Sequence, residues 1–400
     1  MANTPDDKKF SPMDKALPNV QNLDLDKEDT APSVDVNLEP PAPEPGPQIT
    51  DLADGGAEVN FDPNQVTPQD PNDHFANLAD LLPDSVLGTL GSDLYEKHMD
   101  YKASRKEWED TYIKGLDLLG FKYQPRTQPF QGASGATHPV LAEAVTQFQA
   151  LAYKELLPAD GPIRTQVMGA PTPQKDQQAQ RVKNYMNYML MNEMKGYDED
   201  FDQMLFYLPL AGSTFKKVYY DAVEGSPVSK FVPADDLLVP YSATSLEDAE
   251  TIMHIIKMSQ NEIKKQQFAG FYRDIDLGTP QWFEDPLTAK EKEIDGQKKT
   301  KPEDIFTLFE CHTNLDLEGF EDVNPQTGEP TGIKLPYIIT IDSGSRSVLS
   351  IRRNYAPNDP TKKKIQYFVH FKFLPGLGFY GFGLIHMIGG LSRTATVALR

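Results

Sequence analysis

The first 75 residues of the chain lack the apolar side chains that a folded core requires. They contain 12 of the 33 prolines and only three aromatic residues, Phe10, Phe61 and Phe75. They also carry 16 Asp or Glu residues against four Lys, which amounts to −12 of the net charge of −20. Low hydrophobicity with a high net charge leaves too little buried apolar area to offset the entropy of ordering. The composition predicts a disordered, acidic, proline-rich tail over residues 1–85, so the fold must be built from residues 86–400.

The rest of the chain divides into a helical part and a β-rich part. Apolar residues at helical spacing predict helices over 92–119, 139–156, 174–194 and 198–209. Pro209 is expected to end or kink the last of these. Runs rich in β-branched and aromatic residues predict strands over 163–168, 214–220, 228–232, 251–258, 305–314, 337–341, 348–353 and 365–373.

Between the strands, the pair Ser259 and Glu262 has the spacing of a capping box and predicts a short helix that ends near Gly270. Residues 274–304 are rich in charge and are expected to form a loop. The sequence therefore predicts an α+β fold with a mostly antiparallel sheet. Its parts are a helical region over 86–212, a β-rich region over 213–380 and a final helix over 381–400.

The final helix continues to the last residue. Its apolar residues recur at helical spacing up to Arg400, and no Gly, Asn or Pro follows its final turn. We therefore expect the natural protein to continue beyond Arg400 in the same helix.

Charge and cysteine content restrict the class of protein. Because the tail carries −12, only −8 remains for the other residues, which is not the basic balance of a protein that grips nucleic acid through its phosphates. A protein that encloses DNA and lets it slide remains compatible with this charge. The single cysteine, Cys311, excludes an internal disulfide and fits a reducing compartment. The N-terminus lacks the basic and apolar regions of a signal peptide, so none is expected.

One stretch approaches the length of a membrane span. Residues 373–391 contain no Asp, Glu, Lys or Arg, and a spanning helix needs about 20 apolar residues. Pro375 and six glycines make this stretch a poor continuous helix. Membrane insertion through 373–391 is kept as an alternative, and we expect no membrane contact.

Three glycines offer the sharpest indication of an enzyme. Gly376, Gly378 and Gly381 match the pattern G-x-G-x-x-G, after a predicted strand and before a predicted helix, as dinucleotide binding requires. Against this, Pro375 interrupts the strand exit, and the acidic residue expected about 20 positions further on would lie past Arg400. A nucleotide-binding enzyme that uses the loop GLGFYG is therefore the alternative hypothesis.

Other candidate chemistry is weak. Asp235 and Asp236 are adjacent between two prolines, and in an extended segment their side chains point to opposite faces. They are expected to serve a turn, a helix cap or a contact between subunits rather than to share a metal or a proton. Cys311 and His312 diverge in the same way. We predict no catalytic residue, no cofactor and no metal ligand.

A basic cluster, Lys362, Lys363 and Lys364, leads into the aromatic residues Tyr367 and Phe368. Such a mixture can contact DNA phosphates, although a solvated loop is the simpler interpretation. These three lysines are the candidate DNA contacts of the chain.

Several segments resemble, in the same order, the portal proteins (head-to-tail connectors) of tailed double-stranded DNA phages, especially the short-tailed group. The segments are PFQGASGATHPVLAEAV (129–145), YKELLPADGPIRTQVMG (153–169), LPLAGSTFKKVYYD (208–221), KFVPADDLLVPYSATSLEDAE (230–250) and FYGFGLIHMIGGLSRTATVALR (379–400). No single segment is as specific as a set of metal ligands, so the weight lies in their number and order.

The resemblance implies a structural protein of the virion and no enzyme. It implies a ring, usually a dodecamer, that is assembled in the host cytoplasm at one vertex of the capsid. Double-stranded DNA passes through this ring during genome packaging and ejection. The implied partners are the large subunit of the terminase, the scaffold and capsid proteins, and the tail adaptors. Residues 86–380 correspond to the wing domain and 381–400 to the start of the stem helix, whereas the clip is missing.

Overall fold

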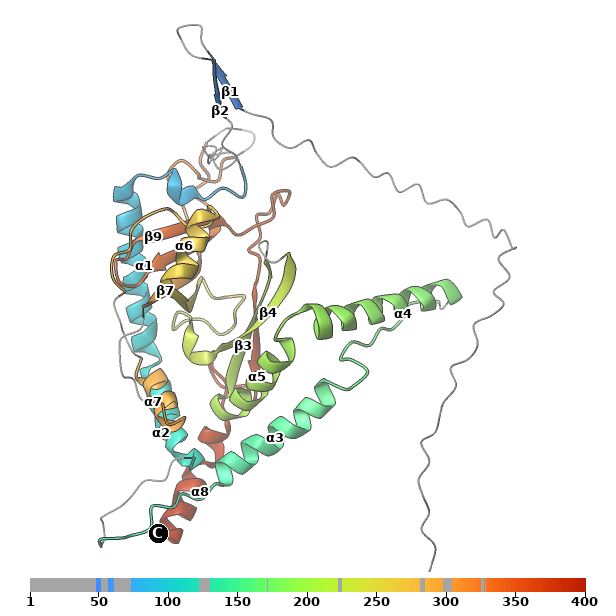
Figure 1. The fold of residues 1–400 in the computed structure, drawn as a ribbon, viewed down its shortest axis with the longest axis vertical. Helices are drawn as coiled ribbons and strands as arrows, with labels where there is room; N and C mark the ends of the chain where they lie inside the picture. The colour runs from blue at the N-terminus through green and yellow to red at the C-terminus, as the bar shows by residue number, and fades with distance from the viewer. Residues whose placement is uncertain are drawn as a thin grey trace, which may run out of the picture. The chain divides into compact units, whose positions relative to one another are not determined.

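The chain falls into two units, Met1–Gln65 and Val66–Arg400 (Figure 1). The computed structural model describes residues 48–51, 57–60, 73–121, 130–170, 172–221, 225–280, 285–297, 304–324, 327 and 329–400. In the first unit, β1 (Gln48–Asp51) pairs antiparallel with β2 (Ala57–Asn60). The remainder of the predicted tail up to residue 72 lies outside the described residues.

The second unit contains both helices and antiparallel sheet, which confirms the predicted α+β fold. Its α-helices are α1 (Asp84–Ser104), α2 (Lys106–Leu116), α3 (Val140–Leu156), α4 (Pro173–Tyr188), α5 (Tyr197–Ala211), α6 (Gln260–Phe268), α7 (Pro286–Ile294) and α8 (Leu384–Leu399). Its short helical turns are η1 (Leu78–Asp80), η2 (Asp117–Leu119), η3 (Met189–Glu193) and η4 (Ala234–Asp236). Its strands are β3 (Ser213–Asp221), β4 (Ser226–Pro233), β5 (Leu237–Leu238), β6 (Thr251–Ser259), β7 (Ile305–Leu315), β8 (Leu335–Asp342), β9 (Val348–Arg353) and β10 (Phe368–Lys372).

The larger sheet has the strand order β5-β6-β7-β8-β9, with every pair antiparallel. Helix α1 covers it, and its buried Leu87 and Leu94 join Phe309 and Ile339 of the strands in one hydrophobic core. Leu78 of η1 is fully buried in the same core. The predicted end of the tail at residue 85 is therefore too late, because the segment from residue 73 onward contributes to this core.

The smaller sheet has the order β10-β3-β4, also antiparallel. Phe215 of β3, Val232 of β4, Leu237 of β5 and Phe379 share a second hydrophobic core. A third core joins α2, α3, α5, α7 and α8, with Tyr112, Leu141 and Ile385 among its buried members. Leu238 and Leu237 of β5 belong to the first and the second core respectively, so β5 lies where these two cores meet.

Several predicted boundaries differ from the structure. The helix predicted over 92–119 begins eight residues earlier, at Asp84, and is interrupted at Arg105, whose φ of −103° and ψ of 9° leave the helical region. Helix α5 continues past Pro209 for two residues, to Ala211, so Pro209 does not end it. The helix ends instead at Gly212, which has a φ of +88°.

Two predicted segments have a different structure. Residues 163–168 are extended but pair with no described strand, so the predicted strand is wrong. The loop predicted over 274–304 contains α7, because Pro286 occupies its first turn and Leu287 is fully buried against the third core. The capping box of Ser259 and Glu262 is confirmed at the start of α6.

Helix α4 forms a projecting arm together with the extended segment 161–170 (Figure 1). No residue of α4 is buried. The arm is held together by a few polar contacts. The amide of Ile163 donates to Oδ1 of Asn187 at 2.9 Å, and Oγ1 of Thr165 donates to the carbonyl of Ala179 at 3.0 Å. The arm is therefore the part of the second unit with the least packing of its own.

Candidate functional site

Arg105 is the polar centre that joins the helices to the segment 230–250. Its side chain is almost wholly buried at the break between α1 and α2. One nitrogen donates to the carbonyl oxygens of Ala234 at 2.7 Å and of Leu237 at 3.0 Å, and another donates to the carbonyl of Asp235. Its Nε lies 2.7 Å from a carboxylate oxygen of Glu109. The guanidinium thus satisfies three carbonyl groups of the turn between β4 and β5.

Asp235 and Asp236 lie in that same turn, the short helix η4. The predicted extended geometry, in which the two side chains diverge, is therefore wrong, whereas the predicted turn role agrees with the structure. Burial raises the pKa of Asp235, and the positive charge of Arg105 opposes this shift. Burial, followed by the charge of Asp235, raises the pKa of Asp236 to about 7.

Glu291 of α7 is the third carboxylate of this group. Its pKa is raised to about 8, first by burial and then by the charges of Asp235 and Asp236. Its Oε1 is buried and makes no hydrogen bond to the described residues. Lys257 of β6 provides a nearby cation, because its Nζ lies 3.4 Å from Oγ1 of Thr288 on α7. Among the described residues, no group of three or more His, Cys, Asp or Glu side chains is arranged to hold a metal ion.

A second buried polar group, which the sequence did not indicate, connects the two sheets. Nζ of Lys217 on β3 donates to both carboxylate oxygens of Glu310 on β7 at 2.7 Å, and Nε2 of His312 lies 2.8 Å from one of them. Burial by itself would raise the pKa of Glu310, but Lys217 and His312 lower it. Burial raises the pKa of the neighbouring Cys311 thiol, so this cysteine is a poor nucleophile.

The glycine-rich loop GLGFYG is folded against the end of α5 and the start of β3. The amide of Gly381 donates to Oγ of Ser213 at 2.7 Å, and the amide of Phe382 donates to the carbonyl of Leu374 at 2.8 Å. The amide of Gly383 donates to Nδ1 of His386 at 3.2 Å. These donors are thus engaged within the chain, whereas a dinucleotide site would direct backbone amides toward a phosphate.

Two alanine substitutions distinguish packing from nucleotide binding at this loop. A Cβ at Gly381 would lie 2.5 Å from the carbonyl oxygen of Gly212, whereas a Cβ at Gly378 would meet nothing within 4 Å. We expect Gly381→Ala to lower the free energy of unfolding by on the order of 1–2 kcal/mol and Gly378→Ala to change it little. Urea denaturation would measure both. Loss of binding to a dinucleotide column in Gly378→Ala, with unchanged stability, would contradict the packing role.

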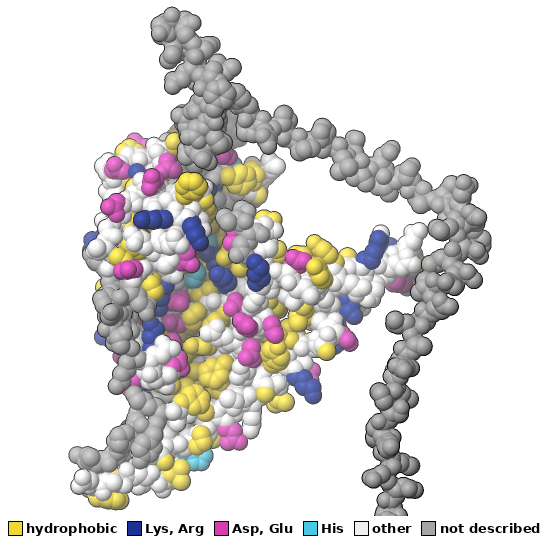
Figure 2. Space-filling view, in the orientation of Figure 1, with side chains coloured by type: hydrophobic (Ala, Val, Ile, Leu, Met, Phe, Trp, Pro, Cys, Tyr) yellow, Lys and Arg dark blue, Asp and Glu magenta, His cyan; other side chains and the backbone are white. Residues whose placement is uncertain are grey.

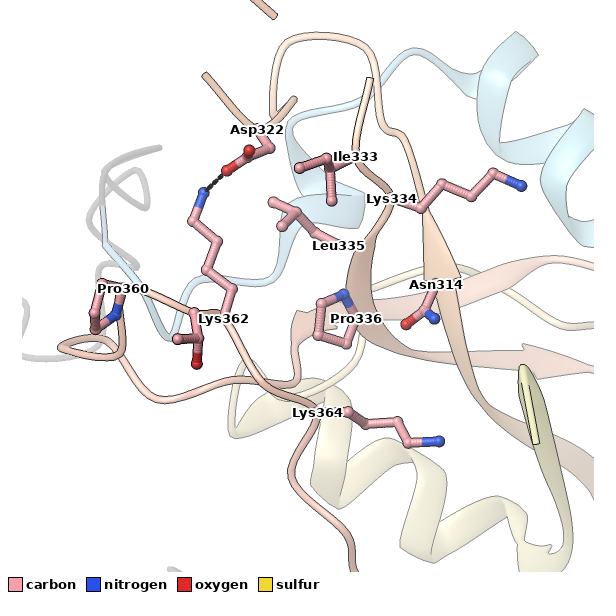
Figure 3. A pocket seen from close by; sticks show the side chains of 10 residues that line it. Asn314, Asp322, Ile333, Lys334, Leu335, Pro336, Pro360, Lys362 and Lys364 are labelled. Carbon is pink, nitrogen blue, oxygen red and sulfur yellow. Dashed lines mark hydrogen bonds and ion pairs between the residues drawn. The ribbon is translucent and has the colours of Figure 1, made fainter. Parts of the chain in front are cut away.

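Two of the three candidate DNA-contact lysines, Lys362 and Lys364, line a pocket of about 300 Å³ (Figure 3). Nζ of Lys362 is paired with the carboxylate of Asp322, and Nζ of Lys364 donates to the carbonyl of Ala249 at 3.1 Å. Lys363 is exposed. Two of the three lysines therefore bind the protein itself, which leaves Lys363 as the member of the cluster best placed to meet a phosphate.

The stretch 373–391 does not form one continuous helix. Its first part is a loop that includes a single β-bridge between Leu374 and Phe382, and its second part is the first half of α8. In the part of the chain that the structure describes, no helix is long and apolar enough to cross a membrane.

Large apolar side chains are exposed on the helical layer. Figure 2 shows hydrophobic side chains gathered over α3 and α5. The exposed fraction is 70% for Leu151 of α3, 63% for Tyr185 of α4 and 70% for Leu391 of α8. Exposed apolar patches on a folded protein are typical of interaction surfaces.

Comparison with known proteins adds no identification: no protein-family model matches the chain, and no curated protein matches it in sequence.

Proposed function

We propose that the chain is a subunit of a phage portal, a ring at one vertex of the capsid through which double-stranded DNA enters and leaves. The observation that carries the proposal is the helical layer, where α4 has no buried residue and α3 and α8 expose large apolar side chains. A helix that buries no face of its own, or that exposes large apolar side chains, gains stability from packing against a partner. A subunit that is completed by its neighbours in a ring accounts for these faces.

The position of the resembling segments supports the same proposal. Segments 208–221, 230–250 and 379–400 are far apart in the sequence, yet Phe215, Val232 and Phe379 share one hydrophobic core. Arg105 fixes the turn within 230–250. The resemblance therefore concerns residues that form one contiguous scaffold rather than scattered loops.

In this proposal the protein acts mechanically and by docking. Double-stranded DNA passes through the ring, and the terminase large subunit, the scaffold and capsid proteins and the tail adaptors bind to it in the virion or during its assembly. The acidic balance lowers adhesion to the DNA, because like charges repel, and this suits sliding. In this proposal the chain needs no catalytic group.

Negative-stain electron microscopy of the full-length protein tests the proposal. We expect rings with a central hole and, in class averages, twelve-fold symmetry. Measurement of particle mass in solution checks that the rings exist without the support film. A protein that stays monomeric at micromolar concentration, or that is retained on a dinucleotide column, would contradict a portal.

A further inference from the structure

The arm made of α4 and residues 161–170 combines basic and apolar side chains. Lys175 and Arg181 are exposed, and neither makes an ion pair with the described residues. Val182 is 49% exposed and Tyr188 51% exposed on the same helix. Figure 2 shows Lys and Arg side chains toward the free end of the arm. Basic groups beside apolar ones suit a partner surface that is acidic and partly apolar.

Helix α1 presents such a surface. Three exposed acidic residues lie on one face of this helix, at spacings of three and four, and form a stripe: Asp93, Glu96 and Asp100. None of the three makes an ion pair with the described residues of its own chain. Met99, which lies beside Glu96 and Asp100, is 52% exposed. The acidic stripe, together with Met99, therefore offers the negative charge and the apolar side chain that would complement the arm.

The arm and the acidic stripe cannot meet within one subunit. In Figure 1, α1 and α2 run along one side of the second unit, while α4 projects from the opposite side. Two different surfaces on opposite sides of a molecule join copies head to tail, and such contacts generate a ring when the rotation between successive copies closes.

We propose that the arm of one subunit docks on the acidic stripe of a second copy of this chain, with Lys175 and Arg181 facing Glu96 and Asp100 of the neighbour. Val182, which is next to Arg181, then packs near Met99. The inference rests on the proposed ring function, since it names the surfaces that hold the ring together. The proposed contact is heterologous, because the arm and the acidic stripe are different surfaces. Each subunit therefore docks its arm on one neighbour and receives the arm of the other neighbour.

A pair of charge reversals tests this interface in the full chain. In the arm variant, Lys175→Glu and Arg181→Glu place negative charge against the acidic stripe. In the stripe variant, Glu96→Lys and Asp100→Lys place positive charge against the arm. We expect each variant alone to associate on the order of 100-fold more weakly, because like charges are juxtaposed at every contact. An equimolar mixture of the two is expected to assemble again, since every contact between unlike variants joins opposite charges.

Particle mass in solution is the readout, and circular dichroism checks that each variant is folded. The matched control is Lys264→Glu with Lys265→Glu, which makes the same charge change on exposed residues of α6 and should leave assembly unchanged. If the wild type forms rings and both variants also do so, the inference is wrong while the proposed function stands. A wild type that never assembles contradicts the proposed function itself. An arm variant that keeps its rings but loses affinity for a short DNA duplex would assign the arm to DNA.

Discussion

Replacement of Arg105 by methionine is expected to lower the free energy of unfolding by about 3–5 kcal/mol, the range for breaking a buried ion pair. Methionine keeps much of the side-chain volume, so the loss reflects polar interactions. The substitution removes the donor to the carbonyls of Ala234 and Asp235 and leaves Glu109 without its cation. Chemical denaturation followed by circular dichroism would measure the change.

Two further variants show whether the shape of the guanidinium matters. Arg105→Lys keeps the charge but not the planar fork that reaches several acceptors, so we expect it to restore less than half of the lost stability. Arg393→Met makes the same change as Arg105→Met at an exposed position of α8 and should alter stability by no more than about 0.5 kcal/mol. If Arg105→Met and Arg393→Met lowered the free energy of unfolding equally, the polar centre around Arg105 would add nothing to stability.

The sequence was sufficient wherever local patterns determine structure. The apolar spacing of residues 139–156 produced α3, and the capping box produced α6. The strands β7, β8 and β9 lie where β-branched and aromatic residues concentrate, because these residues fit a half-buried pleated surface. These elements and the α+β class were therefore predictable from local sequence patterns alone.

The polar centre was not predictable in this way, because its members are distant in sequence. Arg105 lies 129 residues from Ala234, and the spacing of apolar residues over 92–119 gives no sign of a break at this arginine. Asp235 and Asp236 were interpreted from extended geometry, whereas the bonds from Arg105 hold them in a turn. Glu291 lies in a charge-rich segment that resembles a loop, and the helix there is stabilised by the burial of Leu287 in the third core. Tertiary contacts decide each of these cases.

The raised pKa values in this centre predict an unusual dependence of stability on pH. Asp236 and Glu291 lose their protons near pH 7 and 8 in the folded chain, but near their ordinary values of 3.8 and 4.5 when it unfolds. The folded state therefore binds more protons between about pH 4 and 8, so the free energy of unfolding falls as pH rises, by up to about 1.4 kcal/mol per pH unit for each group.

Other buried groups with shifted pKa values affect the free energy of unfolding mainly outside the range from pH 6.5 to 8. Burial lowers the pKa of His98 to about 4 and that of His254 and His370 to about 3. These histidines make stability rise with pH only up to their ordinary value of 6.5, because the unfolded chain binds more protons below it. Burial lowers the pKa of Lys216 to about 8, so this lysine makes stability rise with pH mainly around and above pH 8. Between pH 6.5 and 8 the carboxylates dominate, and stability is expected to fall.

The substitution Asp236→Asn is expected to remove about half of the decrease in the free energy of unfolding between pH 6.5 and 8. It should also raise the free energy of unfolding at pH 8 by about 1–3 kcal/mol, since one pKa unit corresponds to about 1.4 kcal/mol and the three carboxylates share the effect. Urea denaturation at several pH values between 6.5 and 8 would measure the slope. Asp316→Asn, the same change at an exposed position, should leave the slope as in the wild type. A wild-type stability that rises steadily from pH 6.5 to 8 would mean that these carboxylates are already ionised in the folded protein, with Arg105 and Lys257 compensating their charge.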